Sequence, residues 1–154
     1  MTTPAARSGD RTAHRSPVQT AALAYGAVFL LVGLAGFIPG ITTNYDTLQF
    51  AGHHSEAMLM GLFQVSVLHN IVHLLYGLAG IAMARSAPAA RKYLLWGGVV
   101  YIVLWIYGLL VGQESQANFV PLNTADDWLH LFLGATMVGL SFLDRDHDRR
   151  TARR

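Results

Sequence analysis

Two histidines of this 154-residue chain stand in the same local context. The segments that contain them, Asn70 to Gly77 and Asp127 to Gly134, both follow the pattern Asn/Asp-x-x-His-Leu-x-x-Gly. Residues three or four apart share a helix face, so each histidine lies beside the Asn or Asp before it. The repeat predicts two helices that bring His73 and His130 together at a similar depth.

Further polar side chains fall on the same two faces. His69 lies one helical turn before His73, and Asp126 lies one turn before His130. The two helices are therefore expected to gather one polar cluster, made of His69, Asn70, His73, Asp126, Asp127 and His130.

One hypothesis is that this cluster binds a cofactor. Imidazole suits haem iron, copper and zinc, and two histidines on separate helices are the minimum for bis-histidine haem ligation. Haem would be ligated by His73 and His130, with Gly77 and Gly134 leaving room for a flat ring. A transition metal would instead be held by His69, His73, Asp127 and His130.

The alternative hypothesis is structural, with no cofactor. In lipid, Asn, Asp and His hydrogen-bond between helices, for about 0.6 to 2 kcal/mol per contact. Asn70, Asp126 and Asp127 would then serve packing and capping only. The run that starts at Thr124 resembles a capping box, and its two carboxylates favour the positive end of the helix dipole.

The loop from Pro39 to Val65 offers a weaker metal site. His53, His54 and Glu56 could combine with His69, although adjacent histidines on a loop are commonly just solvated. The apolar run 57–63 is too short to cross a bilayer and predicts a short interfacial helix capped by Ser55, which could cover the polar cluster.

Four apolar segments position these residues. They span residues 21–38, 66–84, 93–112 and 125–143. A helix of this length crosses a hydrocarbon core of roughly 30 Å. The sequence therefore predicts an all-α integral membrane four-helix bundle, and the His-containing repeat predicts two helical hairpins related as a parallel repeat.

The charges orient the predicted bundle. All eleven Lys and Arg precede the first segment, separate the second from the third, or follow the fourth. The two remaining loops and the start of the fourth segment carry only acids. Because Lys and Arg in short loops resist translocation, we expect a multi-pass protein of the cell membrane with cytoplasmic termini. Residues 1–20 are expected to form a disordered tail, and residues 144–154 a charged tail.

Several classes of function are disfavoured. The chain has no cysteine, no phosphate loop, no H-E-x-x-H motif and no clustered basic face for nucleic acid. An enzyme is therefore not expected. The prediction is a non-catalytic accessory or structural membrane component, with a haem- or metal-binding redox bundle as the alternative. Its expected partners are the lipid bilayer and either a second copy or another membrane protein.

Two long strings add a family resemblance. Residues 61–77 and 118–131 resemble small bacterial four-span membrane proteins catalogued as a domain of unknown function, and the likeness extends over residues 20–143. The resemblance implies a four-helix membrane architecture and no established activity, substrate or cofactor. The family usually has Asn where Asp127 stands, which weakens any mechanism that needs a carboxylate there.

Overall fold

The computed structural model describes residues 15–143, and the predicted tails fall largely outside this range. Four helices and a small three-stranded sheet make up the described chain. In chain order these are α1 (Pro17–Ala35), β1 (Thr42–Thr43), the 3₁₀ turn η1 (Tyr45–Thr47), β2 (Met58–Leu59), β3 (Phe63–Gln64), α2 (Val67–Met83), α3 (Ala87–Leu110) and α4 (Thr124–Leu140). The fold is mostly helical, and the sheet corrects the expectation of an all-α chain.

The helices begin at capping residues. Ser16 and Gln19 form a capping box at the start of α1, where Pro17 occupies the first turn, so the helix begins four residues before the predicted boundary. Ser66 accepts a hydrogen bond from the His69 amide at the start of α2. These caps satisfy amides that have no partner within the helix.

The cap of α4 differs from the one predicted. Asn123, and not Thr124, is the N-cap: its side chain accepts from the Asp126 amide, and the Asp126 carboxylate accepts from the Asn123 amide. The capping-box prediction was therefore wrong by one residue. Asp126 can close the box only from the third helical position, which fixes the cap at Asn123.

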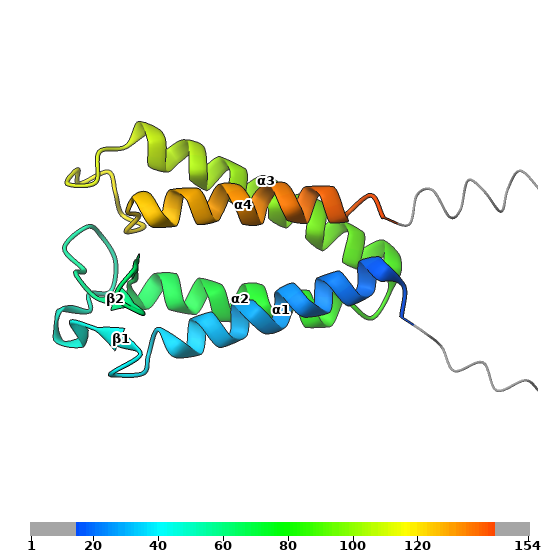
Figure 1. Cartoon of the computed structure of the whole chain (residues 1–154), viewed down its shortest axis with the longest axis horizontal. Coiled ribbons are helices and arrows are strands. Elements are labelled where there is room, and N and C mark those ends of the chain that lie inside the picture. Colours follow the sequence, from blue (N-terminus) through cyan, green and yellow to red (C-terminus); the bar gives the residue numbers. More distant parts are fainter. Residues whose placement is uncertain (1–14, 144–154) are drawn as a thin grey trace, which may run out of the picture.

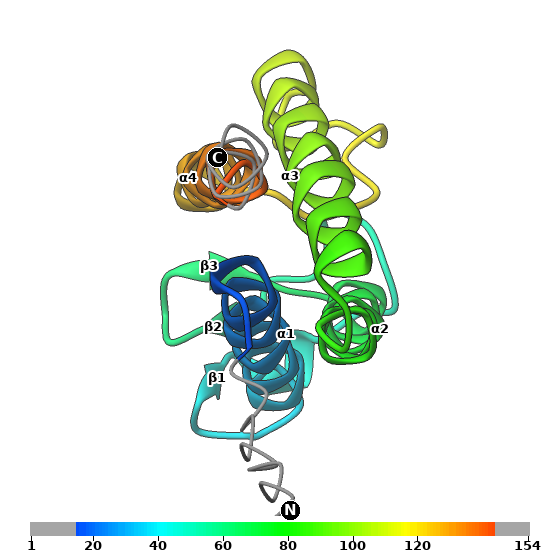
Figure 2. The same cartoon turned by 90° about the vertical axis from the view of Figure 1, so that its right-hand side faces the viewer.

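The four helices pack as two antiparallel hairpins. α1 lies chiefly against α2, and α3 lies chiefly against α4 (Figure 1). The start of α1, the α2–α3 turn and the end of α4 share one end of the bundle, and the strands share the other. Viewed along the helices, α3 inclines from the neighbourhood of α2 toward α4 (Figure 2). The hairpins therefore separate toward the end that carries the strands.

The two helices of each hairpin approach each other closely at a pair of glycines. A Cβ atom on Gly26 would lie 2.9 Å from the Gly77 carbonyl oxygen, and one on Gly98 would lie 2.8 Å from that of Gly134. Small residues allow such close backbone approach. Gly77 and Gly134 are therefore covered by the neighbouring helix, which corrects the hypothesis that they leave space for a flat ring.

The loop before α2 folds as a β-hairpin. β2 pairs antiparallel with both β1 and β3, and Met60 and Gly61, at the β2–β3 turn, have positive φ. The Ser55 hydroxyl donates to the Val65 carbonyl instead of capping a helix. The predicted helix at 57–63 is therefore wrong, because the left-handed turn at Met60 and Gly61 reverses the chain where a helix would continue.

Apolar side chains cover the outside of every helix. The exposed fractions are 66% for Leu31 on α1, 61% for Leu75 on α2, 58% for Val103 on α3 and 63% for Phe132 on α4. Among the described helices, α1 and α3 are long and apolar enough to cross a membrane, and α2 is a shorter apolar helix. This gives weak support for a membrane location.

Candidate functional site

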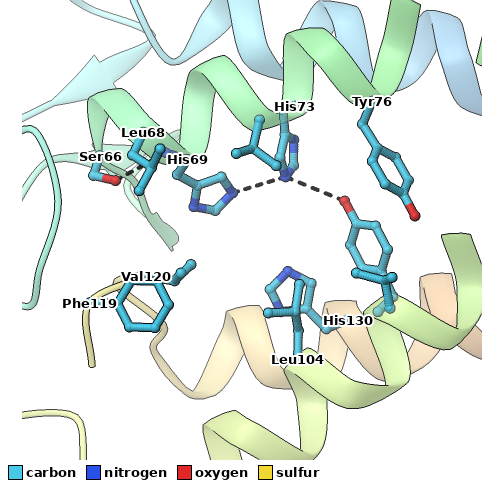
Figure 3. A pocket seen from close by; sticks show the side chains of 12 residues that line it. Ser66, Leu68, His69, His73, Tyr76, Leu104, Phe119, Val120 and His130 are labelled. Carbon is cyan, nitrogen blue, oxygen red and sulfur yellow. Dashed lines mark hydrogen bonds between the residues drawn. The ribbon is translucent and has the colours of Figure 1, made fainter. Parts of the chain in front are cut away.

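The predicted histidines meet between the two hairpins, in the half of the bundle that carries the strands. His69 and His73 extend from α2, and His130 extends from α4 toward them (Figure 3). The Nε2 atoms of His69 and His73 lie 3.0 Å apart, and the Tyr101 hydroxyl lies 3.4 Å from Nε2 of His73. All four side chains are at least nine-tenths buried. We call His69, His73, Tyr101 and His130 the histidine cluster.

Two stacked aromatic rings support the histidine cluster. The rings of Phe29 and Tyr101 are stacked with centroids 5.4 Å apart and planes 14° from parallel. Phe29 also meets the His73 ring edge-on at 5.6 Å, and Tyr101 lies 5.1 Å from the His130 ring. Each hairpin thus packs one aromatic ring against one of its histidines, edge-on for Phe29 and His73 and tilted for Tyr101 and His130, which fixes these imidazoles from both sides.

Asp126 belongs to the hairpin loop as much as to the histidines. Its Oδ2 accepts from the Gln64 amide at 3.0 Å and from the Asn123 amide at 3.1 Å. The carboxylate therefore ties β3 to the start of α4. It lies at the edge of the histidine cluster and shares a small cavity with it.

Asn70 and Asp127 occupy equivalent places away from the histidine rings. A Cβ atom on Gly36 would collide with the Asn70 amide group, and one on Gly108 would collide with the Asp127 carboxylate. Each polar side chain is therefore packed over a glycine near the end of the first helix of its own hairpin. The structure splits the six predicted polar residues into a histidine group, a cap at Asp126 and two packing residues.

The arrangement does not assemble the predicted metal ligands. Among residues 15–143, no group of three His, Cys, Asp or Glu side chains could hold a metal ion. Asp127 packs over Gly108, while His54 and Glu56 are exposed on the loop. The loop site predicted with His69 is therefore not assembled either.

The site also fits haem poorly. Nε2 of His73 already faces His69 and Tyr101, and the glycines that were to admit a flat ring contact helix backbone. The α2–α3 space beside the histidines is a cavity of about 270 Å³, which is below the usual range for drug-sized ligands. A macrocycle would require the two hairpins to move apart.

Some nitrogen atoms of the histidine cluster have no hydrogen-bond partner in the described chain. Nδ1 of His69, His73 and His130 is buried without a hydrogen-bond partner in the described chain. With neutral rings, the His69–His73 bond uses one Nε2–H donor and one Nε2 acceptor. One of these two rings then keeps a free Nδ1 acceptor and the other a free Nδ1–H donor. Buried polar atoms of this kind are costly unless they are satisfied.

Two cavities flank the histidine cluster. The larger, of about 270 Å³, lies between α2 and α3 and is closed at one end by Phe119 and Val120. The smaller, of about 100 Å³, lies between α1 and α4 and is closed by Leu59, Met60 and Phe63 of the β-hairpin. We call them the α2–α3 cavity and the α1–α4 cavity. Both are lined by all four residues of the histidine cluster.

Comparison with known proteins identifies a family for nearly the whole helical region. Residues 19–143 match the model of the domain of unknown function DUF4383. The chain belongs to this family. The match agrees with the predicted placement over residues 20–143. No curated protein and no solved structure matches the chain. The DUF4383 assignment therefore brings no known activity with it, and the role of the histidine cluster has to be argued from its geometry.

The histidine repeat of this DUF4383 domain does not point to Phe29 and Tyr101. Their signal lies in a second repeat, because Gly26, Phe29 and Gly36 recur 72 residues later as Gly98, Tyr101 and Gly108. The positions of the histidine repeat are offset by 57 residues. Two different offsets hide the relation in the sequence, since the loop within the first hairpin is longer than the loop within the second.

Proposed function

We propose that the chain is a non-catalytic integral membrane protein with four spans, both termini cytoplasmic and a histidine cluster in the outer half of the membrane. The observation that carries the proposal is the exposed apolar surface on all four helices. In water such continuous apolar surface would be unfavourable, whereas in lipid it is the expected outer face. α2 and α4 have 17 residues each, or roughly 26 Å of helix, which suits a thin hydrocarbon core.

Charge at the two ends of the bundle supports the orientation. The cations of the described chain, Arg15, Arg85, Arg91 and Lys92, accompany the start of α1 and the α2–α3 turn. Asp46, Glu56 and Glu114 lie in the loops at the opposite end. Because basic loops stay on the cytoplasmic side, the strands and the histidine cluster belong to the outer half.

Single cysteines test this topology, because the natural chain has none. Gln116 lies in the exposed α3–α4 loop, and Ser86 is exposed in the α2–α3 turn. With a membrane-impermeant maleimide on intact cells, we expect Gln116→Cys to be labelled and Ser86→Cys to be labelled only after lysis. Equal labelling of both in intact cells, or of neither after lysis, would refute the four-span topology.

Within this proposal the histidine cluster joins the two hairpins. The contacts from His73 to Tyr101 and to Phe29 connect α2 with α3 and α1. Interhelical hydrogen bonds in membranes are worth about 0.6 to 2 kcal/mol. An accessory role would then be carried by the apolar outer surface, which offers binding sites for lipid, a second copy or another membrane protein.

An absorbance spectrum with elemental analysis distinguishes this role from the redox alternative. We expect protein purified in detergent from a haem- and metal-replete host to lack a Soret band and stoichiometric metal. A Soret band that disappears in both His73→Ala and His130→Ala would instead establish a haem protein.

A further inference from the structure

The two cavities beside the histidine cluster are related by the internal repeat. His69, Val72 and Tyr76 line the α2–α3 cavity, and the residues 57 positions later, Asp126, Leu129 and Leu133, line the α1–α4 cavity. On the first helix of each hairpin, Leu104 lines one cavity and Val32, 72 positions earlier, lines the other. The cavities are therefore the same inter-hairpin cleft, formed twice.

The chain itself fills one cleft. Leu59 is 5% exposed and extends with Phe63 from the β-hairpin into the lining of the α1–α4 cavity. The equivalent place in the α2–α3 cavity has only Phe119 and Val120 at its end, and its volume is nearly three times larger. The β-hairpin inserts an apolar wedge into the α1–α4 cavity. The α2–α3 cavity is without this wedge, so it suits an apolar group of similar width.

Within the described chain, the unfilled cleft is lined by one unpartnered polar side chain more than the filled one, since the three histidines line both. Its wall includes Tyr76, whose hydroxyl is buried without a partner in the described chain, as well as the histidines with free Nδ1 atoms. No Arg, Lys, Asp or Glu of the described chain lines it. A charged head group would therefore lose its hydration without gaining a counter-ion, whereas a neutral oxygen could accept or donate a hydrogen bond.

A path for a tail continues along the same two helices. A more open groove of about 400 Å³ shares Tyr76 and Val100 with the α2–α3 cavity and runs past Trp96 to Lys92. At the rim, Val72 and Val100 are 47% and 48% exposed, which is the lipid-facing side of the proposed bundle. A molecule could enter sideways from the bilayer and leave its tail in this groove.

We propose that the α2–α3 cavity is a binding site for a neutral, lipid-soluble molecule with a small oxygen-bearing head and a single apolar tail, of which a quinone is the chemical type. The head lies against His69, His73 and His130, and the tail follows the groove between α2 and α3. The inference rests on the proposed membrane location, which the cysteine labelling tests independently of any ligand.

Calorimetric titration of the full chain in detergent with 2-decyl-1,4-benzoquinone tests the site. We expect one molecule bound per chain. Leu104→Trp, which fills the cavity, should weaken binding by about tenfold or more. The matched control is Leu109→Trp on the same helix, at a side chain that is 58% exposed and lines neither cavity, and it should change the affinity by less than about twofold.

Two further measurements separate the causes of any loss. Val100→Trp blocks the cavity at its half-exposed rim, so it should weaken binding even if Leu104→Trp fails to fold. Decylbenzene has the same tail and no oxygen, and it should bind about tenfold more weakly or worse, because the buried polar atoms stay unsatisfied. Equal binding of both probes, or unchanged quinone binding in the folded tryptophan variants of the cavity, would overturn the proposal.

Discussion

The hairpins α1–α2 and α3–α4 use the same framework and differ where they line the clefts. The framework positions match: Gly26 with Gly98, and Gly77 with Gly134, each allow backbone contact at the crossing. Two positions that face the clefts do not match, because His69 corresponds to Asp126 and Tyr76 corresponds to Leu133. Helix contact therefore requires the same residue twice, whereas the cleft residues are free to diverge.

The loops at the strand end of the bundle explain why the two clefts differ. The long first loop folds into a β-hairpin that covers the α1–α4 cavity and is tied to α4 through the Asp126 carboxylate. The second loop is shorter and contributes only Phe119 and Val120 to the other cavity. One cleft is thus narrowed by the chain, and its counterpart keeps the larger volume, while the imidazoles of the histidine cluster line both.

The largest loss of stability is expected at the two helix crossings, which are equivalent in the two hairpins. Gly26→Leu and Gly98→Leu should each destabilise the bundle by about 3 kcal/mol or more, because the side chain meets backbone atoms that cannot move aside. Chemical unfolding in detergent measures the loss. Gly139→Leu is the control, since a Cβ atom at Gly139 would have none of the neighbouring side chains or helices of the described chain within 4 Å. A large loss at only one crossing would break the equivalence.

Removal of the apolar wedge should make the two clefts more alike. Leu59→Ala deletes a buried side chain and should cost about 2 to 3 kcal/mol of unfolding free energy while enlarging the α1–α4 cavity. Leu62→Ala, in the same turn at a side chain that is 53% exposed, should change stability little. Similar losses in both variants would show that the Leu59 side chain does not pack as a wedge in the cavity.

The tie between the β-hairpin and α4 should be weaker than the wedge. Asp126→Ala leaves the amides of Gln64 and Asn123 without their acceptor, so we expect a loss of about 1 to 2 kcal/mol. Hydrogen exchange should rise first at these two amides. Glu114→Ala removes an exposed acid from the α3–α4 loop and serves as the control. Unchanged protection of both amides would contradict the assigned role of Asp126.

The smallest effect concerns the two packing residues. Asp127→Asn makes the second hairpin match Asn70 of the first, and it removes a buried carboxylate whose Oδ1 has no partner in the described chain. We expect a gain of about 0.5 kcal/mol in unfolding free energy, since burial of an amide costs less than burial of a charge. A clear loss of stability would indicate that the carboxylate has a partner or a function of its own.

Much of the helical framework could be predicted from the sequence. The four apolar segments matched four helices within a few residues at most ends, because long apolar runs bounded by Pro, Gly and capping residues leave few alternatives. The start of α3 was the exception, since Ala87 to Lys92 carries charge but continues as helix behind Pro88. Charged residues show where an apolar segment begins, but they do not interrupt the backbone hydrogen bonds, so the helix extends beyond the apolar segment.

The candidate site was predicted in part. The repeated histidine motif correctly brought His73 and His130 to one place, with His69 beside them. It wrongly added Asn70 and Asp127, which share a turn with the histidines but point to a glycine of the neighbouring helix. Spacing along one helix gives the face to within about a quarter of a turn, and that precision does not separate two adjacent contacts.

The sequence by itself determined the family, the four helices, their segregated charges and the convergence of the histidines, because each follows from a composition or spacing pattern that is visible along the chain. The tertiary structure decided the β-hairpin, the stacking of Phe29 on Tyr101 and the contrast between a filled and an unfilled cleft. The β-hairpin is tied to α4 through Asp126, and the stacking and the clefts join residues of different helical hairpins through side-chain volume and direction. Such contacts exist only after the helices have packed, so no local pattern encodes them.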